Sequence, residues 1–399
     1  MMKIIFCDDD QHTLMHYLPG PLAMVNKFLF ILVISFTGVF QVRAQEPVKS
    51  DSTAKGKIIM KGLFQARYLF SSHKNIDLNG LHHPDGKAVY NDFDIKRARL
   101  QFTSKISDRT DVVLLLNLAD FKTDPKNKVL ENAYITYRLD NFINLKMGQF
   151  RPAFGLEDMY PVDVIKSMDY SNQYTAFGNN GWQSFQIGAS IYGATHGEIP
   201  VKYELSVVNG NNRNQLMDND NGKHFSTRVE LGLQKSLKIK LGLNGGLATV
   251  LGSSVYASGV DLSGVVPLGK KWSLEIETEF KQGNNHTYYY ALDSAKRVGG
   301  IGNYQMRGMY FLPNLRYAIN YHRLSSLEFS CRYENFNNDF KHAANNQRQT
   351  ITPMISAEFL KAYSARIQFG VNIDRYKRNI PGTTQYNNEM FIVQVQSRL

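Results

Sequence analysis

The chain has 399 residues, a formal net charge of +11 at pH 7, and a high aromatic content of 22 Tyr and 24 Phe. After residue 44 no apolar run approaches the ~20 residues that a membrane-spanning helix needs. Of the two cysteines, Cys7 precedes the export signal described below, which leaves only Cys331, so a disulfide-stapled secreted scaffold is excluded. The basic balance favours anionic solutes, lipopolysaccharide or nucleic acid as partners, without choosing among them.

Near the N-terminus the sequence has the layout of a secretory signal peptide, with basic Lys27, an apolar run at 28–40 and small Ala44 at the expected cleavage point. A membrane anchor is the alternative, but the apolar run is too short for one. Three successive aspartates from Asp8 do not suit the start of a signal, so we expect translation to begin at Met24. The expected organisation is a mis-assigned upstream segment, a signal peptide, a polar leader and one barrel domain, at residues 1–23, 24–44, 45–56 and 57–399.

From residue 57 onward, apolar and polar residues alternate with a period of two in about seventeen segments, two of which, 304–312 and 315–321, lie on either side of Pro313. In the segment that starts at Phe93, Arg97 and Arg99 share one face, while the other carries Ala98 and Leu100 and also includes Lys96. Segments of this kind match the strands of outer-membrane barrels, and single-chain bacterial barrels have even strand numbers. The pattern therefore predicts an all-β fold, a transmembrane antiparallel β-barrel of 16 strands, with 18 as the alternative.

A secreted β-sandwich, solenoid or propeller would also alternate. Here, however, full charges occupy the polar faces of strand after strand, as at Glu275, Glu277 and Glu279, while large aromatic residues occur near strand ends. Such aromatics are what the girdles of a membrane barrel require. The distribution of charge therefore favours the barrel.

The alternation stops between Arg151 and Gly181, where prolines and glycines occur and a helical turn is expected near 162–168. Long loops inside a repeating strand pattern are usually functional. We interpret this segment as an inward-folded constriction loop; an extracellular loop outside the pore is the alternative. Its basic residues would face anions and its acidic residues would oppose them, the former being Arg151 and Lys166 and the latter Glu157, Asp158, Asp163 and Asp169.

Three motifs, FDIKRARLQF, LENAYITYRL and KMGQFRPAFGLEDM, resemble the phosphate-selective porin O and P family of Gram-negative outer membranes. The resemblance is strongest over residues 92–193. It implies a sixteen-stranded barrel, usually trimeric, whose third loop narrows a channel lined by basic residues. The chain departs from such barrels at Leu399, where they commonly end in an aromatic residue. The expected pore-lining, anion-facing residues are Arg67, Arg97, Arg99, Lys146, Arg151 and Lys166.

No nucleophile elbow or Gly-rich phosphate loop occurs, and His82, His83 and His286 lack partners at metal-ligand spacing. We therefore expect no enzyme activity, cofactor, metal or nucleic-acid partner. The predicted function is a porin of the outer membrane for passive diffusion of small polar solutes, with a bias toward anions or phosphate as a further hypothesis. Outer-membrane lipid, lipopolysaccharide and two further copies of the chain are the expected partners. A non-conducting structural or partner-binding barrel and an outer-membrane hydrolase are the alternatives.

Overall fold

The computed structural model describes residues 56–122, 129–215, 217–218, 220–342, 345–360 and 363–398. The predicted upstream segment, the signal peptide, all but the last residue of the leader, and Leu399 lie outside these residues. Residues 52–399 form one compact unit, and all the described residues belong to it.

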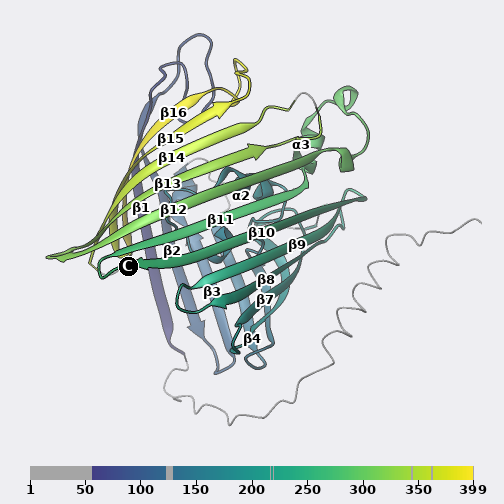
Figure 1. Ribbon diagram of the computed structural model, residues 1–399. Helices are drawn as coiled ribbons and strands as arrows, with labels where there is room; N and C mark the ends of the chain where they lie inside the picture. The colour runs from purple at the N-terminus through teal and green to yellow at the C-terminus, as the bar shows by residue number, and fades with distance from the viewer. Residues whose placement is uncertain are drawn as a thin grey trace, which may run out of the picture. The chain divides into compact units, whose positions relative to one another are not determined.

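Sixteen antiparallel strands pair with their neighbours in chain order, and β1 pairs with β16 to close a barrel (Figure 1). This confirms the predicted all-β barrel and its strand number. The strands are β1 (Ile58–Ser71), β2 (Asn91–Lys105), β3 (Thr110–Asn117), β4 (Leu130–Arg138), β5 (Asn144–Phe150), β6 (Gln186–Ala194), β7 (Val201–Val208), β8 (His224–Gln234), β9 (Ile239–Val250), β10 (Ser253–Leu268), β11 (Trp272–Asn284), β12 (Gln305–Tyr321), β13 (Leu324–Asn337), β14 (Arg348–Phe359), β15 (Ala365–Tyr376) and β16 (Asn388–Arg398).

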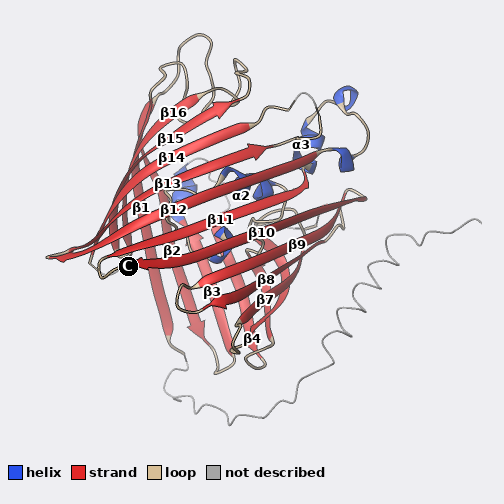
Figure 2. Ribbon diagram, in the orientation of Figure 1, coloured by secondary structure: helices blue, strands red, loops and turns tan. Residues whose placement is uncertain are grey.

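The two ends of the barrel differ in their connections. One end carries short turns, such as 106–109 and 322–323, and the other carries the long loops 72–90, 151–185 and 285–304. Two α-helices lie in these long loops, α2 (Asn172–Asn179) and α3 (His286–Ala291), drawn in blue in Figure 2. No helix in the described ranges is long and apolar enough to cross a membrane. Outer-membrane barrels have short periplasmic and long extracellular connections, so the long loops mark the outer end.

Side chains alternate between the two faces of the wall, as the sequence predicts. In β1, Gln65 is buried while Phe64 is exposed, and in β16, Gln394 is buried while Phe391 is exposed. Because polar residues fill the inner face and apolar residues cover the outer one, the barrel is the inverse of a soluble core. The inner face is held by ion pairs such as Arg228–Asp261 at 2.5 Å.

The seventeenth predicted segment is wrong, because β12 runs unbroken through Pro313, where the sequence suggested two strands. Pro313 lies opposite Ile276 of β11. On either side of the proline β12 keeps its register with β13, where Phe311 pairs with Tyr333 and Asn314 with Ser330. Proline cannot donate to a ladder, yet a long strand tolerates it where its neighbours keep the register.

Lys96 also departs from the predicted pattern. The register of β1 with β2 pairs Gln65 with Arg97 and Ala66 with Ile95, so Lys96 is the extra residue of a β-bulge. The bulge reverses the phase of the alternation, which puts Ile95 on the exposed outer face and turns the Lys96 ammonium toward an inner carboxylate. Strict alternation had assigned Lys96 to the apolar face.

Candidate pore and its constriction

Residues 151–185, between β5 and β6, contact the inner faces of strands far away in the sequence. The Leu156 amide donates to Glu279 of β11 (2.8 Å), and the Asn172 amide donates to Glu334 of β13 (2.6 Å). Arg366 of β15 donates to the Ile165 carbonyl at 3.0 Å. Helix α2 lies against β12 and β13 (Figure 2). Side chains that would otherwise face the lumen are thus used to bind this segment.

Local sequence explains the path of the segment. Gly155 has a φ of +124°, and a Cβ there would lie 2.3 Å from the Glu279 carboxylate, so only glycine fits. Ser171 caps α2 by accepting a hydrogen bond from the Tyr174 amide at 3.2 Å. The helical turn expected at 162–168 is wrong, because its spaced apolar residues, such as Val162 and Ile165, instead pack on Leu63 of β1 in a non-helical stretch.

An aromatic cluster anchors the end of the segment to the wall. Trp182, Phe154 and Phe177 are fully buried, and the rings of Phe154 and Trp182 lie 5.6 Å apart. The Trp182 ring sits over Gly246 of β9, where a Cβ would approach a ring carbon to 2.4 Å. The missing side chain at residue 246 therefore makes room for the anchor.

Asp169 binds three cations of the β1–β2 wall. Its carboxylate lies 2.9 Å from Arg67, 3.2 Å from Lys96 and 3.4 Å from Arg97. Burial by itself would raise the pKa of Asp169, but the nearby Lys96, Arg97 and Arg67 charges hold it below its usual value. Two of the predicted anion-facing residues, Arg67 and Arg97, are thus already bound to a carboxylate of the protein.

Glu157 and Lys166, two further predicted site residues, belong to this segment and are buried against other parts of the protein. Glu157 accepts hydrogen bonds from the Ser171 amide (2.9 Å) and hydroxyl, and burial raises its pKa to about 8 although Arg332 opposes the shift. Lys166 pairs with Glu275 of β11 at 2.7 Å. The sequence placed both among charges facing the channel, whereas their partners here are other protein groups.

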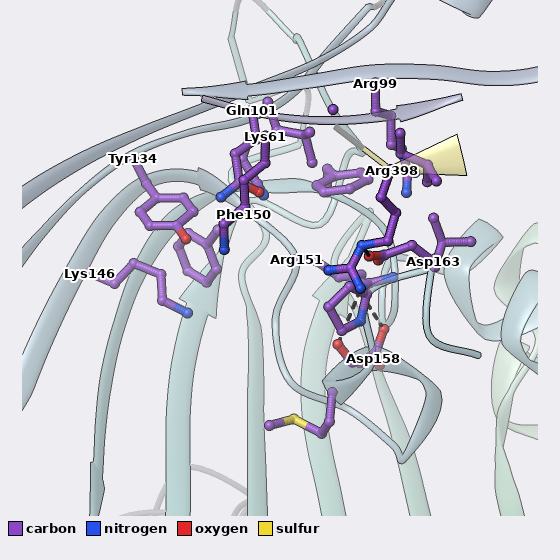
Figure 3. Close-up of a pocket in the computed structure, with 18 residues that line it drawn as sticks. Lys61, Arg99, Gln101, Tyr134, Lys146, Phe150, Arg151, Asp158, Asp163 and Arg398 are labelled. Carbon is purple, nitrogen blue, oxygen red and sulfur yellow. Dashed lines mark hydrogen bonds and ion pairs between the residues drawn. The ribbon is translucent and has the colours of Figure 1, made fainter. Parts of the chain in front are cut away.

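A cavity of about 380 Å³ separates the segment from the β1–β5 side of the wall (Figure 3). It brings together three predicted residues, Arg99, Lys146 and Arg151, with two cations that the sequence analysis did not single out, Lys61 and Arg398. Two predicted acidic residues complete its charged lining, Asp158 and Asp163.

Most of these cations have a carboxylate partner. Arg99 binds Glu131 (2.7 Å), Lys146 binds Glu204 (3.0 Å), Arg151 faces Asp158 (3.6 Å) and Arg398 binds Asp163 (2.7 Å). Lys61 makes no ion pair within the described part of the chain. Burial raises the pKa of Asp158 to about 7 against the opposing charge of Arg151, so this carboxyl is only partly ionised near neutral pH.

Known proteins match both the sequence and the fold. The model of the family described as phosphate-selective porin O and P matches residues 72–240. The predicted relation to this family is confirmed. The chain is an outer-membrane porin. No curated protein sequence matches the porin significantly.

Three solved structures share the fold of this porin at low sequence identity. A loop-deletion form of OmpT, an outer membrane protein of Vibrio cholerae, has a TM-score of 0.55 at 12% identity, covering 88% of this chain and all of that one. The outer membrane channel DcaP of Acinetobacter baumannii has 0.54 at 13%, covering 88% and 99%. An anion-selective porin from Comamonas acidovorans has 0.54 at 10%, covering 86% and 100%. At these identities the likeness shows the fold alone.

Proposed function

We propose that this porin conducts small polar solutes passively through the cavity between segment 151–185 and the β1–β5 wall, and that it favours anions. The observation that carries the proposal is the charge of the lining, in which five cations face two carboxylates. With the partners Glu131 and Glu204 included, cations still exceed carboxylates by one. Guanidinium and ammonium donors replace part of an anion's hydration, while cations meet an electrostatic barrier.

In this proposal segment 151–185 sets the width of the channel. Its support is the set of contacts with β11, β13 and β15, which hold it against the wall opposite the cavity. Arg99, Lys146, Arg151, Asp158 and Asp163 then act at the narrow passage, while Arg67, Arg97, Lys166 and Glu157 act on the conductance indirectly by fixing the segment.

Planar-bilayer recording of the refolded porin tests the function. The current should show stepwise openings. Under a salt gradient across the bilayer, the reversal potential should have the sign that indicates a preference for anions. Lys61→Gln should shift that potential toward zero, because it removes the cavity's cation that has no carboxylate partner. Lys296→Gln is the control, since that residue is exposed in the 285–304 loop and pairs there with Asp293. A silent bilayer, or cation preference in the parent protein, would refute the proposal.

We further propose a homotrimer packed through the β3–β7 wall. There β3, β5 and β7 have 8, 7 and 8 residues, while β12 has 17. A tilted strand needs about 9–11 residues to cross the hydrocarbon layer, so this wall is short for lipid contact. One of the similar OmpT structures is described as a trimer form.

Cross-linking in detergent tests the trimer and should give a trimer band. Met147→Arg, on the outer face of β5, should abolish that band. If the parent protein gives monomer alone, the proposed trimer is wrong.

The porin family supports a channel over the two alternatives, a closed structural barrel and an outer-membrane hydrolase. The bilayer experiment separates the first, because a closed barrel carries no current. Lipase and protease assays on the same preparation separate the second, and activity above that of a mock preparation would favour it. Phosphate preference is tested by replacing chloride with phosphate in the reversal-potential measurement.

A further inference from the structure

The cavity has two walls of different chemistry. On one side stand the rings of Tyr134 in β4 and Phe150 at the end of β5, with centroids 6.4 Å apart in an edge-to-face arrangement. The Lys146 ammonium lies 5.8 Å and 4.6 Å from these two rings. On the other side lie the ion pairs Arg398–Asp163 and Arg151–Asp158, and Figure 3 shows the rings and these pairs facing the same space.

Further apolar groups line the cavity. They are Leu115 of β3 and Phe185 before β6, together with Met159 and Val162 of segment 151–185. A small inorganic anion can use the cations, but it gains nothing from this surface and loses water against it. A solute that presents an anionic group at one end and an apolar surface at the other uses both walls.

We propose that this cavity is selective for organic carboxylates with a flat apolar body over inorganic anions of the same charge. The inference rests on the proposed channel function and adds the class of solute. The carboxylate would meet the Lys61 ammonium and the Arg398 guanidinium, while the ring would stack against the half-buried Tyr134. Phe150, which is 1% exposed, supports the Tyr134 ring through their edge-to-face contact. A volume of about 380 Å³ admits a single-ring molecule.

Block of the chloride current by added solutes tests this selectivity. Benzoate, acetate, phosphate and the uncharged benzamide are compared at equal concentration in single-channel recordings. Benzoate should block at a concentration severalfold lower than acetate or phosphate, because it has the ring as well as the charge, and lower than benzamide, which lacks the charge. Equal block by benzoate and acetate, or by benzoate and benzamide, would overturn the inference.

Two variants on one strand assign the effect to the ring wall. Tyr134→Leu should weaken benzoate block by about two- to tenfold and leave acetate block unchanged, since aromatic contacts contribute that much beyond buried area. Tyr137→Leu is the matched control, because Tyr137 lies on the same strand, three residues after Tyr134, with its side chain exposed on the outer face of the barrel. If Tyr134→Leu conducts chloride normally and binds benzoate as before, the solute class is wrong and the channel function stands. If neither the parent protein nor the variants conduct at all, the proposed function itself fails.

Discussion

Replacing Asp169 with Asn is expected to release segment 151–185 from the β1–β2 wall. The carboxylate is the shared partner of Arg67, Lys96 and Arg97, within 3.4 Å of all three. The amide keeps the size of the side chain but removes its charge. Asp94 also pairs with Arg67 at 3.0 Å, so three cations and two carboxylates, formally +1, become three cations and one carboxylate, formally +2. The group that bound the segment has then lost its charge.

The size of the effect follows from the burial of the site. Removing one partner of a fully buried ion pair costs about 3–5 kcal/mol, while an exposed pair is worth about 0.2–1 kcal/mol. The Asp169 side chain is 28% exposed and those of Arg67 and Arg97 are 8% exposed. An intermediate loss of about 2 kcal/mol would raise the population of displaced segment about thirtyfold, because 1.4 kcal/mol is a factor of ten.

Two measurements check the prediction at neutral pH. Single-channel recordings of Asp169→Asn should show a larger mean conductance with more frequent fluctuations. Trypsin should cut after Lys166, which is buried in the parent porin. Asp293→Asn serves as the control, because Asp293 and its partner Lys296 are both exposed and neither lines the cavity. If Asp169→Asn matches the parent porin in conductance, noise and trypsin resistance, Asp169 does not hold the segment.

The pH dependence of this contact has a defined sign. Because neighbouring cations lower the pKa of Asp169, its contribution is complete above the ordinary value of 3.8 and is lost only as the pH falls through the lower folded value. The difference between the parent porin and Asp169→Asn should therefore persist throughout the neutral range.

Two further predictions concern the cavity and its aromatic anchor. Burial raises the pKa of Asp158 to about 7. Raising the pH from about one unit below to about one unit above that value should therefore add negative charge to the cavity and reduce its anion preference. Asp158→Asn should lose most of this pH dependence, the remainder coming from Glu157 with its pKa of about 8, and an unchanged pH dependence would contradict this origin. Gly246→Ala should displace Trp182 at a cost of about 1–3 kcal/mol, because the new Cβ would lie 2.4 Å from the ring. With Trp272→Phe as background, Trp182 is the sole tryptophan of the sequence, and an unshifted tryptophan emission maximum would refute the clash.

The faces of the strands could be predicted from the sequence, because a strand's side chains point to opposite sides whatever the rest of the chain does. Local alternation therefore put Arg99 and Lys146 on the inner wall, as found. It failed at Lys96, where a bulge adds one residue and reverses the phase. It failed again at Pro313, where it predicted a break between two strands. The single strand β12 continues through the proline, because the residues on both sides remain paired with the neighbouring strands.

Sequence by itself therefore determined the barrel, its approximate strand number and the composition of its inner wall. Only the tertiary structure decided which inner charges remain available to a solute. Arg67, Arg99 and Lys166 all pair with carboxylates, but Arg99 lines the cavity together with Lys61. Segment 151–185 brings Asp169 to Arg67, and Glu275 of β11 pairs with Lys166. Closing the barrel also brings Lys61 and Arg398, from opposite ends of the chain, to one cavity. Such neighbours depend on the path of a long irregular segment and on the pairing of β1 with β16, neither of which a local pattern encodes.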